Sequence, residues 1–202
     1  MTPSPLPPLH TAGIVLAAGA SSRMGRPKAL LKTPANHHLA THQAHLLRTA
    51  GCTPVAVVIG AQAHLLRETL PTPLPLIENP HWAQGRATSV QAGAAAFPDA
   101  DGWLFLPIDA IGIRPLTLRA LLAAAAWNPR VPWRPLHGDQ RGNLLWIPRH
   151  LGPALAALPP DARLDEWIAP QAQSLSVDDP NLLRNVNTPD DFSHLPPSAF
   201  TL

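Results

Sequence analysis

Residues 11–31 read TAGIVLAAGASSRMGRPKALL, an apolar segment followed by a loop of small residues and a basic segment. Residues 11–18 are small or β-branched, which is typical of a strand buried on both faces of a sheet. The loop that follows carries Gly19 and Gly25, so its backbone N–H groups can approach an anion closely. This stretch predicts an α/β domain whose first strand ends at an anion-binding loop.

Basic residues are concentrated just after this loop, although the chain has a formal net charge of only +2. Local cations of this kind suit a polyphosphate, with arginine acting as a fork and lysine as a point charge. A Walker A loop is excluded because the lysine neither follows a glycine directly nor precedes Ser or Thr, and the G-x-G-x-x-G fingerprint is absent. A solvated basic loop stays open as the alternative. The four cations are Arg23, Arg26, Lys28 and Lys32.

Short apolar runs alternate with helical patterns as far as residue 127. The clearest strand is 55–60 (VAVVIG), which we expect at the centre of the sheet. This alternation, with short connections, predicts a single-domain, Rossmann-like, three-layer α/β/α fold with a mostly parallel mixed sheet. The other expected strands are 74–79 and 102–107, and the expected helices are 39–50, 62–70, 88–96 and 115–127.

The second half of the chain has a different pattern. Residues 133–136 and 143–147 look like strands around the turn-rich HGDQRGN, which suggests an antiparallel excursion or a lid. Residues 174–177 are a last, weak strand candidate. Residues 188–191 (TPDD) combine an N-cap threonine, a proline at the first helical position and an acid three residues after the cap, so they predict a terminal helix.

Composition sets further limits. Of the 202 residues, 46% are hydrophobic and 14% are charged, which is typical of one compact domain. Residues 1–10, MTPSPLPPLH, predict a disordered proline-rich tail before a domain over 11–202. Cys52 is the only cysteine, which excludes an internal disulfide and fits a reducing cytoplasm. Because no apolar run could span a bilayer and no long basic run occurs, we expect neither a membrane nor a nucleic acid as partner.

Residues 16–31 resemble the L-A-A-G-x-S-x-R-M-G-x-x-K signature of the nucleotidyltransferase superfamily, and RMGRPKALL looks most like its MobA/MocA-like molybdenum cofactor branch. The similarity continues through NPHWAQGRATS at 79–89, LPID at 106–109, HGDQRGN at 137–143 and NVNTPDD at 185–191. The resemblance implies a nucleotide-diphospho-sugar transferase-like fold. It also implies Mg²⁺-dependent transfer of a nucleoside monophosphate from an NTP, with CTP or GTP favoured, to a phosphorylated acceptor such as molybdopterin, with release of pyrophosphate.

The resemblance assigns roles to single residues as well. Asp109 would bind Mg²⁺, and its place after an apolar strand independently puts a hard oxygen ligand at the carboxyl edge of the sheet. Asn187 stands where some members have a second metal-side acid, and Arg141 would hold the acceptor phosphate. A turn or helix-capping role remains the alternative for Asp109 and Asn187. The implied catalytic residues are Arg23, Lys28 and Asp109, and the implied nucleotide-binding residues are Leu16, Ala17, Ala18, Gly19, Ser21, Ser22, Asn79, Gly85 and Ser89.

Two other functions stay open at this point. One keeps the fold and changes the acceptor, giving a sugar-1-phosphate nucleotidyltransferase. The other is a nucleotide-binding accessory protein without catalysis, whose partner would be a molybdenum enzyme or its chaperone. Three departures from the cofactor branch keep the accessory protein open as an alternative: Ala110-Ile111 in place of Gln-Pro, Asn143 without a following proline, and Asn187 in place of an acid found in some members.

Overall fold

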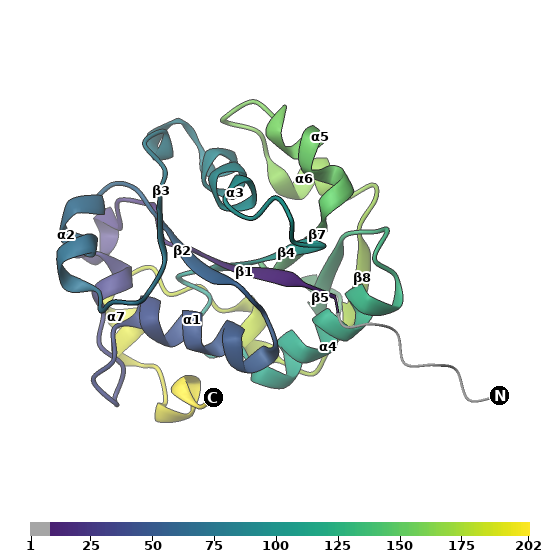
Figure 1. The fold of residues 1–202 in the computed structure, drawn as a ribbon. Helices are drawn as coiled ribbons and strands as arrows, with labels where there is room; N and C mark the ends of the chain where they lie inside the picture. Colours follow the sequence, from purple (N-terminus) through teal and green to yellow (C-terminus); the bar gives the residue numbers. More distant parts are fainter. Residues whose placement is uncertain (1–8) are drawn as a thin grey trace.

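The computed structural model describes residues 9–202, which form one mixed sheet with helices on both faces (Figure 1). Four parallel strands, β1 (Thr11–Leu16), β2 (Val55–Ile59), β3 (Leu76–Glu78) and β4 (Gly102–Pro107), lie in the order β3-β2-β1-β4. The sheet continues through β7 (Leu145–Pro148), antiparallel to β4, then β5 (Trp133–His137) and β6 (Gln140–Arg141). A last strand, β8 (Gln173–Ser176), pairs in parallel with β5.

Helices α1 (Leu39–Ala50) and α4 (Pro115–Trp127) cover one face of the sheet, and α3 (Arg86–Ala95), α5 (Gly152–Ala156) and α6 (Leu164–Ile168) cover the other (Figure 1). The predicted three-layer α/β/α fold is therefore confirmed. Helix α2 (Ala63–Thr69) joins β2 to β3, and α7 (Pro189–Ser193) follows the last strand. Short 3₁₀ helices complete the chain: η1 (Ser22–Met24), η2 (Lys28–Leu30), η3 (Trp82–Gln84), η4 (Arg149–Leu151), η5 (Pro180–Leu183) and η6 (Pro197–Phe200).

Most element bounds agree with the sequence patterns, and α1, α4 and β4 match the predicted ranges. Strand β3 is shorter than the predicted 74–79, because Pro73 and Pro75 have no N–H to donate to the ladder. Helix α3 begins two residues before the predicted 88, with Gly85 as its N-cap. The prediction that β2 lies at the sheet centre was wrong: β1 and β4 are central and β2 is flanked by β1 and β3. Any interior strand buried on both faces has the same apolar composition, so composition does not fix its order.

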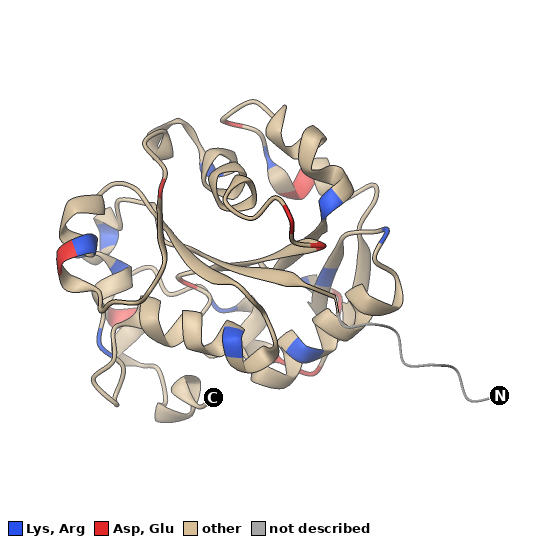
Figure 2. Cartoon of the chain, viewed as in Figure 1, with Lys and Arg blue, Asp and Glu red and all other residues tan. Residues whose placement is uncertain are grey.

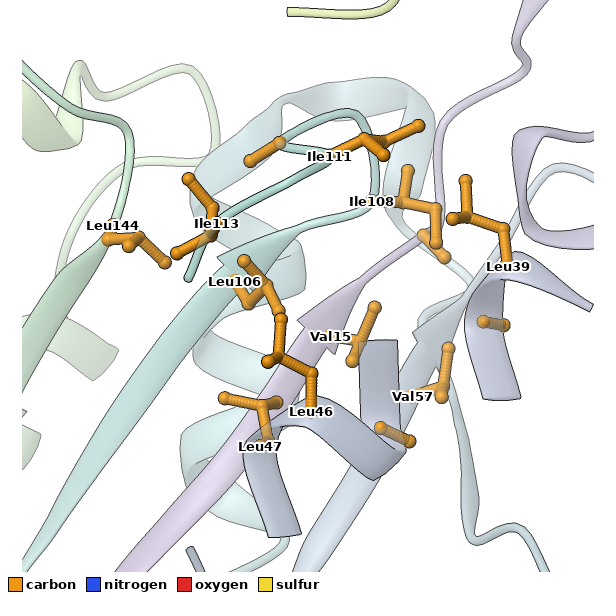
Figure 3. Close-up of a cluster of buried hydrophobic side chains, with 14 of the residues drawn as sticks. Val15, Leu39, Leu46, Leu47, Val57, Leu106, Ile108, Ile111, Ile113 and Leu144 are labelled. Carbon is orange, nitrogen blue, oxygen red and sulfur yellow. The ribbon is translucent and has the colours of Figure 1, made fainter. Parts of the chain in front are cut away.

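The side chains of β1 alternate between two hydrophobic layers. Val15 packs with Leu47 and Leu106 on the α1 and α4 side (Figure 3). Ile14 and Phe105 lie in the layer on the opposite side. All five are at most 2% exposed, and burying each such side chain contributes roughly 1.5–3 kcal/mol. This double packing holds the carboxyl ends of β1 and β4 next to each other.

Two residues of the predicted tail, Leu9 and His10, contact the domain. Residues 1–8 of the predicted tail lie outside the described part of the chain. Leu9, however, packs against the core, and the His10 backbone N–H donates to Asp101 Oδ2 at 2.9 Å. The ordered domain therefore includes at least two residues that were assigned to the tail.

Charged residues are sparse and are spread over helices and loops on both faces of the sheet (Figure 2). Among the helices of residues 9–202, none has the length and apolar character needed to cross a bilayer.

Candidate active site

A cavity of about 490 Å³ opens where β1 and β4 end, at the carboxyl edge of the sheet. Leu16 pairs with Pro107, so the loops after the two strands leave the sheet side by side. This is the edge at which ligands bind in open α/β sheets. The predicted site residues that line the cavity are Leu16, Ala18, Gly19, Ser21, Ser22, Arg23, Lys28, Gly85, Ser89, Asp109 and Asn187.

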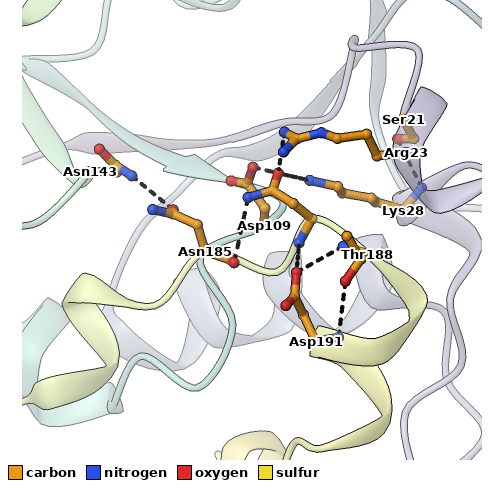
Figure 4. A network of polar contacts seen from close by, with 9 residues as sticks. Ser21, Arg23, Lys28, Asp109, Asn143, Asn185, Thr188 and Asp191 are labelled. Carbon is orange, nitrogen blue, oxygen red and sulfur yellow. Dashed lines mark hydrogen bonds and ion pairs between the residues drawn. The ribbon is translucent and has the colours of Figure 1, made fainter.

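Lys28 lies at the centre of a polar network in this cavity (Figure 4). Its Nζ lies 3.2 Å from Asp109 Oδ2 and donates to Asn187 Oδ1 at 2.9 Å. Arg23 Nη2 donates to the same amide oxygen at 3.1 Å. The side chain of Lys28 is only 10% exposed and that of Asp109 29%, so solvent screens this pair less than a surface pair. The fold thus brings together three segments that are far apart in the sequence. Of the four clustered cations, only Arg23 and Lys28 line the cavity.

The loop that carries Lys28 has a tight backbone conformation at both ends of η1. Ser21 has φ 53° and Gly25 has φ 69°, both in the left-handed region. A side chain is disfavoured there, so Ser21 is strained, whereas glycine is not. Ser21 Oγ also accepts a hydrogen bond of 3.2 Å from the Lys28 backbone N–H. This bond ties the start of the loop to the residue that supplies the ammonium group.

Asn187 is held in place by the N-terminus of α7. Thr188 and Asp191 form the predicted capping box, in which each side chain accepts from the backbone of the other residue. Asp191 Oδ2 accepts the backbone N–H groups of both Asn187 and Thr188 at 2.8 Å. These two bonds hold the pKa of Asp191 below its ordinary value, and the bond from the Asn187 N–H has the larger effect. The cap therefore fixes the backbone from which the Asn187 amide reaches Lys28.

Three predicted site residues do not line this cavity. Ala17 is 9% exposed and packs in the core on the α1 side. Asn79 is 2% exposed, and its Nδ2 donates to Thr88 Oγ1 at 2.8 Å and to Ser89 Oγ at 3.0 Å. It positions Ser89, which does line the cavity, rather than facing a ligand. Arg141 lines a second cavity that adjoins the first.

Gly85 marks a close approach between the start of α3 and the loop before α6. Its φ is 148°, and a Cβ at this position would collide with the carbonyl oxygen of Pro160. Gly85→Ala is therefore expected to lower the free energy of unfolding by about 1–3 kcal/mol, measured by urea denaturation. Gly19→Ala is the matched control, because a Cβ there meets no atom within 4 Å, and its unfolding free energy should change by less than about 0.5 kcal/mol. Equal losses in the two variants would contradict the collision.

Oxygen donors for a divalent cation converge at the same place in the cavity. Asp109 Oδ2 and Asn187 Oδ1 both contact the Lys28 ammonium, which lies between them as a positive charge. Within residues 9–202, no group of three or more His, Cys, Asp or Glu is arranged to hold a metal. Mg²⁺ commonly binds through one or two protein oxygens together with phosphate oxygens and water. Two protein donors do not form a metal cage by themselves, so a Mg²⁺ ion at this place would need phosphate oxygens and water as its other ligands.

Most of the chain matches one known protein family. The model of the MobA-like NTP transferase domain matches residues 13–176. The chain belongs to this family. Its fold is that of the nucleotide-diphospho-sugar transferases.

Two relatives of this chain have names that describe different functions. It is 36% identical over 105 residues to a probable molybdenum cofactor guanylyltransferase of Rhodopirellula baltica, across 51% of this chain and 49% of that relative. It is 33% identical over 156 residues to the nicotine blue oxidoreductase of Paenarthrobacter nicotinovorans, across 72% of this chain and 74% of that relative. Family membership alone therefore does not name the reaction.

A solved structure shares the fold at low sequence identity. The crystal structure of Rv0371c from Mycobacterium tuberculosis superposes with a TM-score of 0.77 at 24% identity, covering 91% of this chain and 96% of that one. The backbone of this chain is thus shared with a protein that has diverged widely in sequence.

Several residues at the site were missed by sequence reasoning. Asn143 Nδ2 donates to Asn185 Oδ1 at 2.8 Å, and both residues line the cavity. Asn185 belongs to the NVNTPDD motif, so its position in that motif was an available signal. Arg86 lines both cavities and directly follows Gly85. Arg134 lines the second cavity and lies in β5, where nothing in the local pattern sets it apart.

Proposed function

We propose that this chain moves a nucleoside monophosphate from an NTP to a small phosphorylated acceptor and releases pyrophosphate. The observation that carries the proposal is the meeting of Lys28 with Asp109 in one cavity, beside the glycine-containing loop after β1. A loop of backbone N–H groups, a lysine and a carboxylate that can hold Mg²⁺ are the parts that position a triphosphate for phosphoryl-group chemistry.

In this proposal the triphosphate lies against the loop after β1. Backbone N–H groups of Gly19, Ser21 and Ser22 approach its oxygens, while Arg23 and Lys28 neutralise their charge. Gly85 and Ser89, on the opposite wall at the start of α3, lie beside the nucleoside.

The acceptor oxygen attacks the α-phosphorus in line, and the bond from that phosphorus to the bridging oxygen of pyrophosphate breaks. Negative charge then builds on the leaving oxygens. Lys28 and Arg23 are already in place to stabilise this charge, which is how fixed cations lower such barriers. Mg²⁺, held by Asp109 and Asn187, would supply further neutralisation of the triphosphate.

The acceptor we favour is a phosphate monoester, as on molybdopterin. Such a group has a second pKa of about 6, so it is ionised at neutral pH and needs no strong general base. Asp109 is the only carboxylate on the wall of the first cavity, which suits a reaction of this kind. The name of the Rhodopirellula baltica relative supports a molybdenum cofactor acceptor and GTP, and the family pattern keeps CTP open. A molybdenum enzyme would then be the receiver of the product.

A thermal-shift panel of ATP, CTP, GTP and UTP, each with and without Mg²⁺, tests the nucleotide half of the proposal. A ligand at about 100 times its Kd stabilises the folded state by about 2.7 kcal/mol, which for a chain of this size raises Tm by roughly 5–10 °C. We expect such a shift for CTP or GTP only, and a larger one with Mg²⁺. NADH serves as the comparison ligand, because one relative is named an oxidoreductase.

Pyrophosphate release tests the transfer itself. The preferred NTP with Mg²⁺ is mixed with molybdopterin in one arm and with a sugar 1-phosphate in another. Pyrophosphate release that needs molybdopterin supports the proposal. Release only with the sugar 1-phosphate would instead identify a sugar-1-phosphate nucleotidyltransferase. NTP binding without release in either arm would identify an accessory protein, and an NADH shift without any NTP shift would overturn the proposal.

A further inference from the structure

A second cavity of about 730 Å³ adjoins the first. The two share Leu16, Arg86 and Asn143 on their walls, so a molecule in the second cavity can reach the first. Part of the wall of the second cavity is apolar. This part is formed by residues of α3, β4, β7 and α6 and of the segment that precedes β7. Its apolar residues include Val90, Phe105, Leu144, Leu145, Leu164 and Ile168.

Three arginines from separate elements gather on the wall of this cavity: Arg86 at the start of α3, Arg134 in β5 and Arg141 in β6. Burial lowers the pKa of Arg134 below its ordinary value, and the charges of Arg141 and Arg86 lower it further, although Asp165 acts in the opposite direction. Arg134 is therefore exposed to the positive charge of both Arg141 and Arg86, with which it shares the cavity wall.

No carboxylate in residues 9–202 lies within 4.0 Å of these three guanidinium groups. Arg163, on the same cavity wall, differs: it pairs with Asp165 and Glu166, each at 3.1 Å. Acidic side chains are thus available near the cavity, and they neutralise a different arginine.

Arg134 is also incompletely hydrogen-bonded. Its Nη1 donates to the Asp165 carbonyl oxygen at 3.5 Å. Its Nε is buried, and it is one of two buried side-chain nitrogen or oxygen atoms in the described chain that have no hydrogen-bond partner. A buried donor without a partner is costly, and a small turn of the guanidinium would present Nε and Nη2 together to an oxyanion.

We propose that Arg134, with Arg86 and Arg141, binds an oxyanion of the acceptor that is distinct from the phosphate that reacts. The reacting groups lie with Lys28 and Asp109 in the first cavity, whose wall includes neither Arg134 nor Arg141. The ligand class is a small molecule with an apolar body and a remote carboxylate or phosphate. That this molecule is the acceptor rests on the proposed function, whereas the anion site itself rests on the three arginines.

The test is calorimetric titration of inorganic phosphate into the full chain, with the first cavity filled by a non-hydrolysable analogue of the preferred NTP and Mg²⁺. Wild-type protein is expected to bind phosphate, and Arg134→Gln to bind it at least about tenfold more weakly, the scale of one lost charged hydrogen bond. Both should bind the nucleotide equally. Arg130→Gln, an exposed arginine outside both cavities, is the matched control and should retain phosphate binding.

Arg141→Gln provides a second variant if Arg134→Gln does not fold, since Arg141 is exposed on a short edge strand. It should weaken phosphate binding in the same direction. Phosphate binding that is absent in wild-type protein, or unchanged in the folded variants, overturns the inference.

If no NTP binds, the titration is repeated in nucleotide-free Lys28→Ala protein. If phosphate binding to this Lys28→Ala protein still depends on Arg134, the anion site is supported even though the proposed nucleotidyl transfer is not. Replacing phosphate by acetate then distinguishes a site for phosphates from one for carboxylates.

Discussion

Lys28→Ala is expected to lower turnover at least about a hundredfold, the scale of losing a principal charge stabiliser in a preorganised site. The ammonium group lies inside the cavity between Asp109 and Asn187, and its side chain is only 10% exposed. Water cannot replace a fixed positive charge at the same place without reorganisation. The measurement is the kcat of pyrophosphate release, with Tm recorded on the same protein.

Lys32→Ala is the matched control for this substitution. Lys32 belongs to the same basic segment, but its side chain is exposed and its Nζ donates to the Asn36 carbonyl oxygen at 3.1 Å. It should keep kcat within about twofold, as expected for a surface position away from the site. A Lys28→Ala protein with near-normal kcat would remove the role proposed for Lys28.

Asp109→Asn should produce the second large loss, again at least about a hundredfold in kcat. The substitution keeps the shape of the side chain but removes its negative charge. Both Mg²⁺ and Lys28 need that charge for their interaction with residue 109. Nucleotide binding should then no longer depend on Mg²⁺, whereas in the wild-type chain we expect metal to strengthen it. Calorimetry of the preferred NTP with and without Mg²⁺ measures this difference directly.

Asp99→Asn serves as the control, because Asp99 is exposed in a turn before β4 and lies outside the cavity. Its kcat and its Mg²⁺ dependence should match those of the wild type. If Asp109→Asn retained the full effect of Mg²⁺ on binding, the metal would have to be held by other groups, and the assignment of Asp109 would fail.

The two predictions separate binding from chemistry. Loss of Lys28 removes charge that meets the triphosphate directly, so nucleotide affinity should fall with or without metal. Loss of Asp109 should reduce affinity only when Mg²⁺ is present. A common defect in both variants, independent of metal, would instead indicate that breaking the Lys28–Asp109 pair disturbs the loop.

The sequence alone determined the features that are local. Residues 16–31 contain the loop, its glycines and the two cations that line the cavity, Arg23 and Lys28, in one continuous segment, so their proximity follows from chain connectivity. The bounds of α1, α4 and β4 were also predictable, because glycine, proline and apolar periodicity mark them. The capping box of Thr188 and Asp191 is a contact within one turn, which made it equally visible.

Only the tertiary structure decided which side chains line a cavity. It brought Lys28 within 3.2 Å of Asp109, which the sequence had placed only at the same edge of the sheet. It also buried Asn79 beneath Ser89 and put Arg141 with Arg134 on the wall of a second cavity. These outcomes depend on strand order and on the direction of each side chain once helices pack on the sheet. Neither quantity is encoded in a local pattern, because an interior strand is apolar in any position and an arginine in a strand looks the same whether it faces solvent or a cavity.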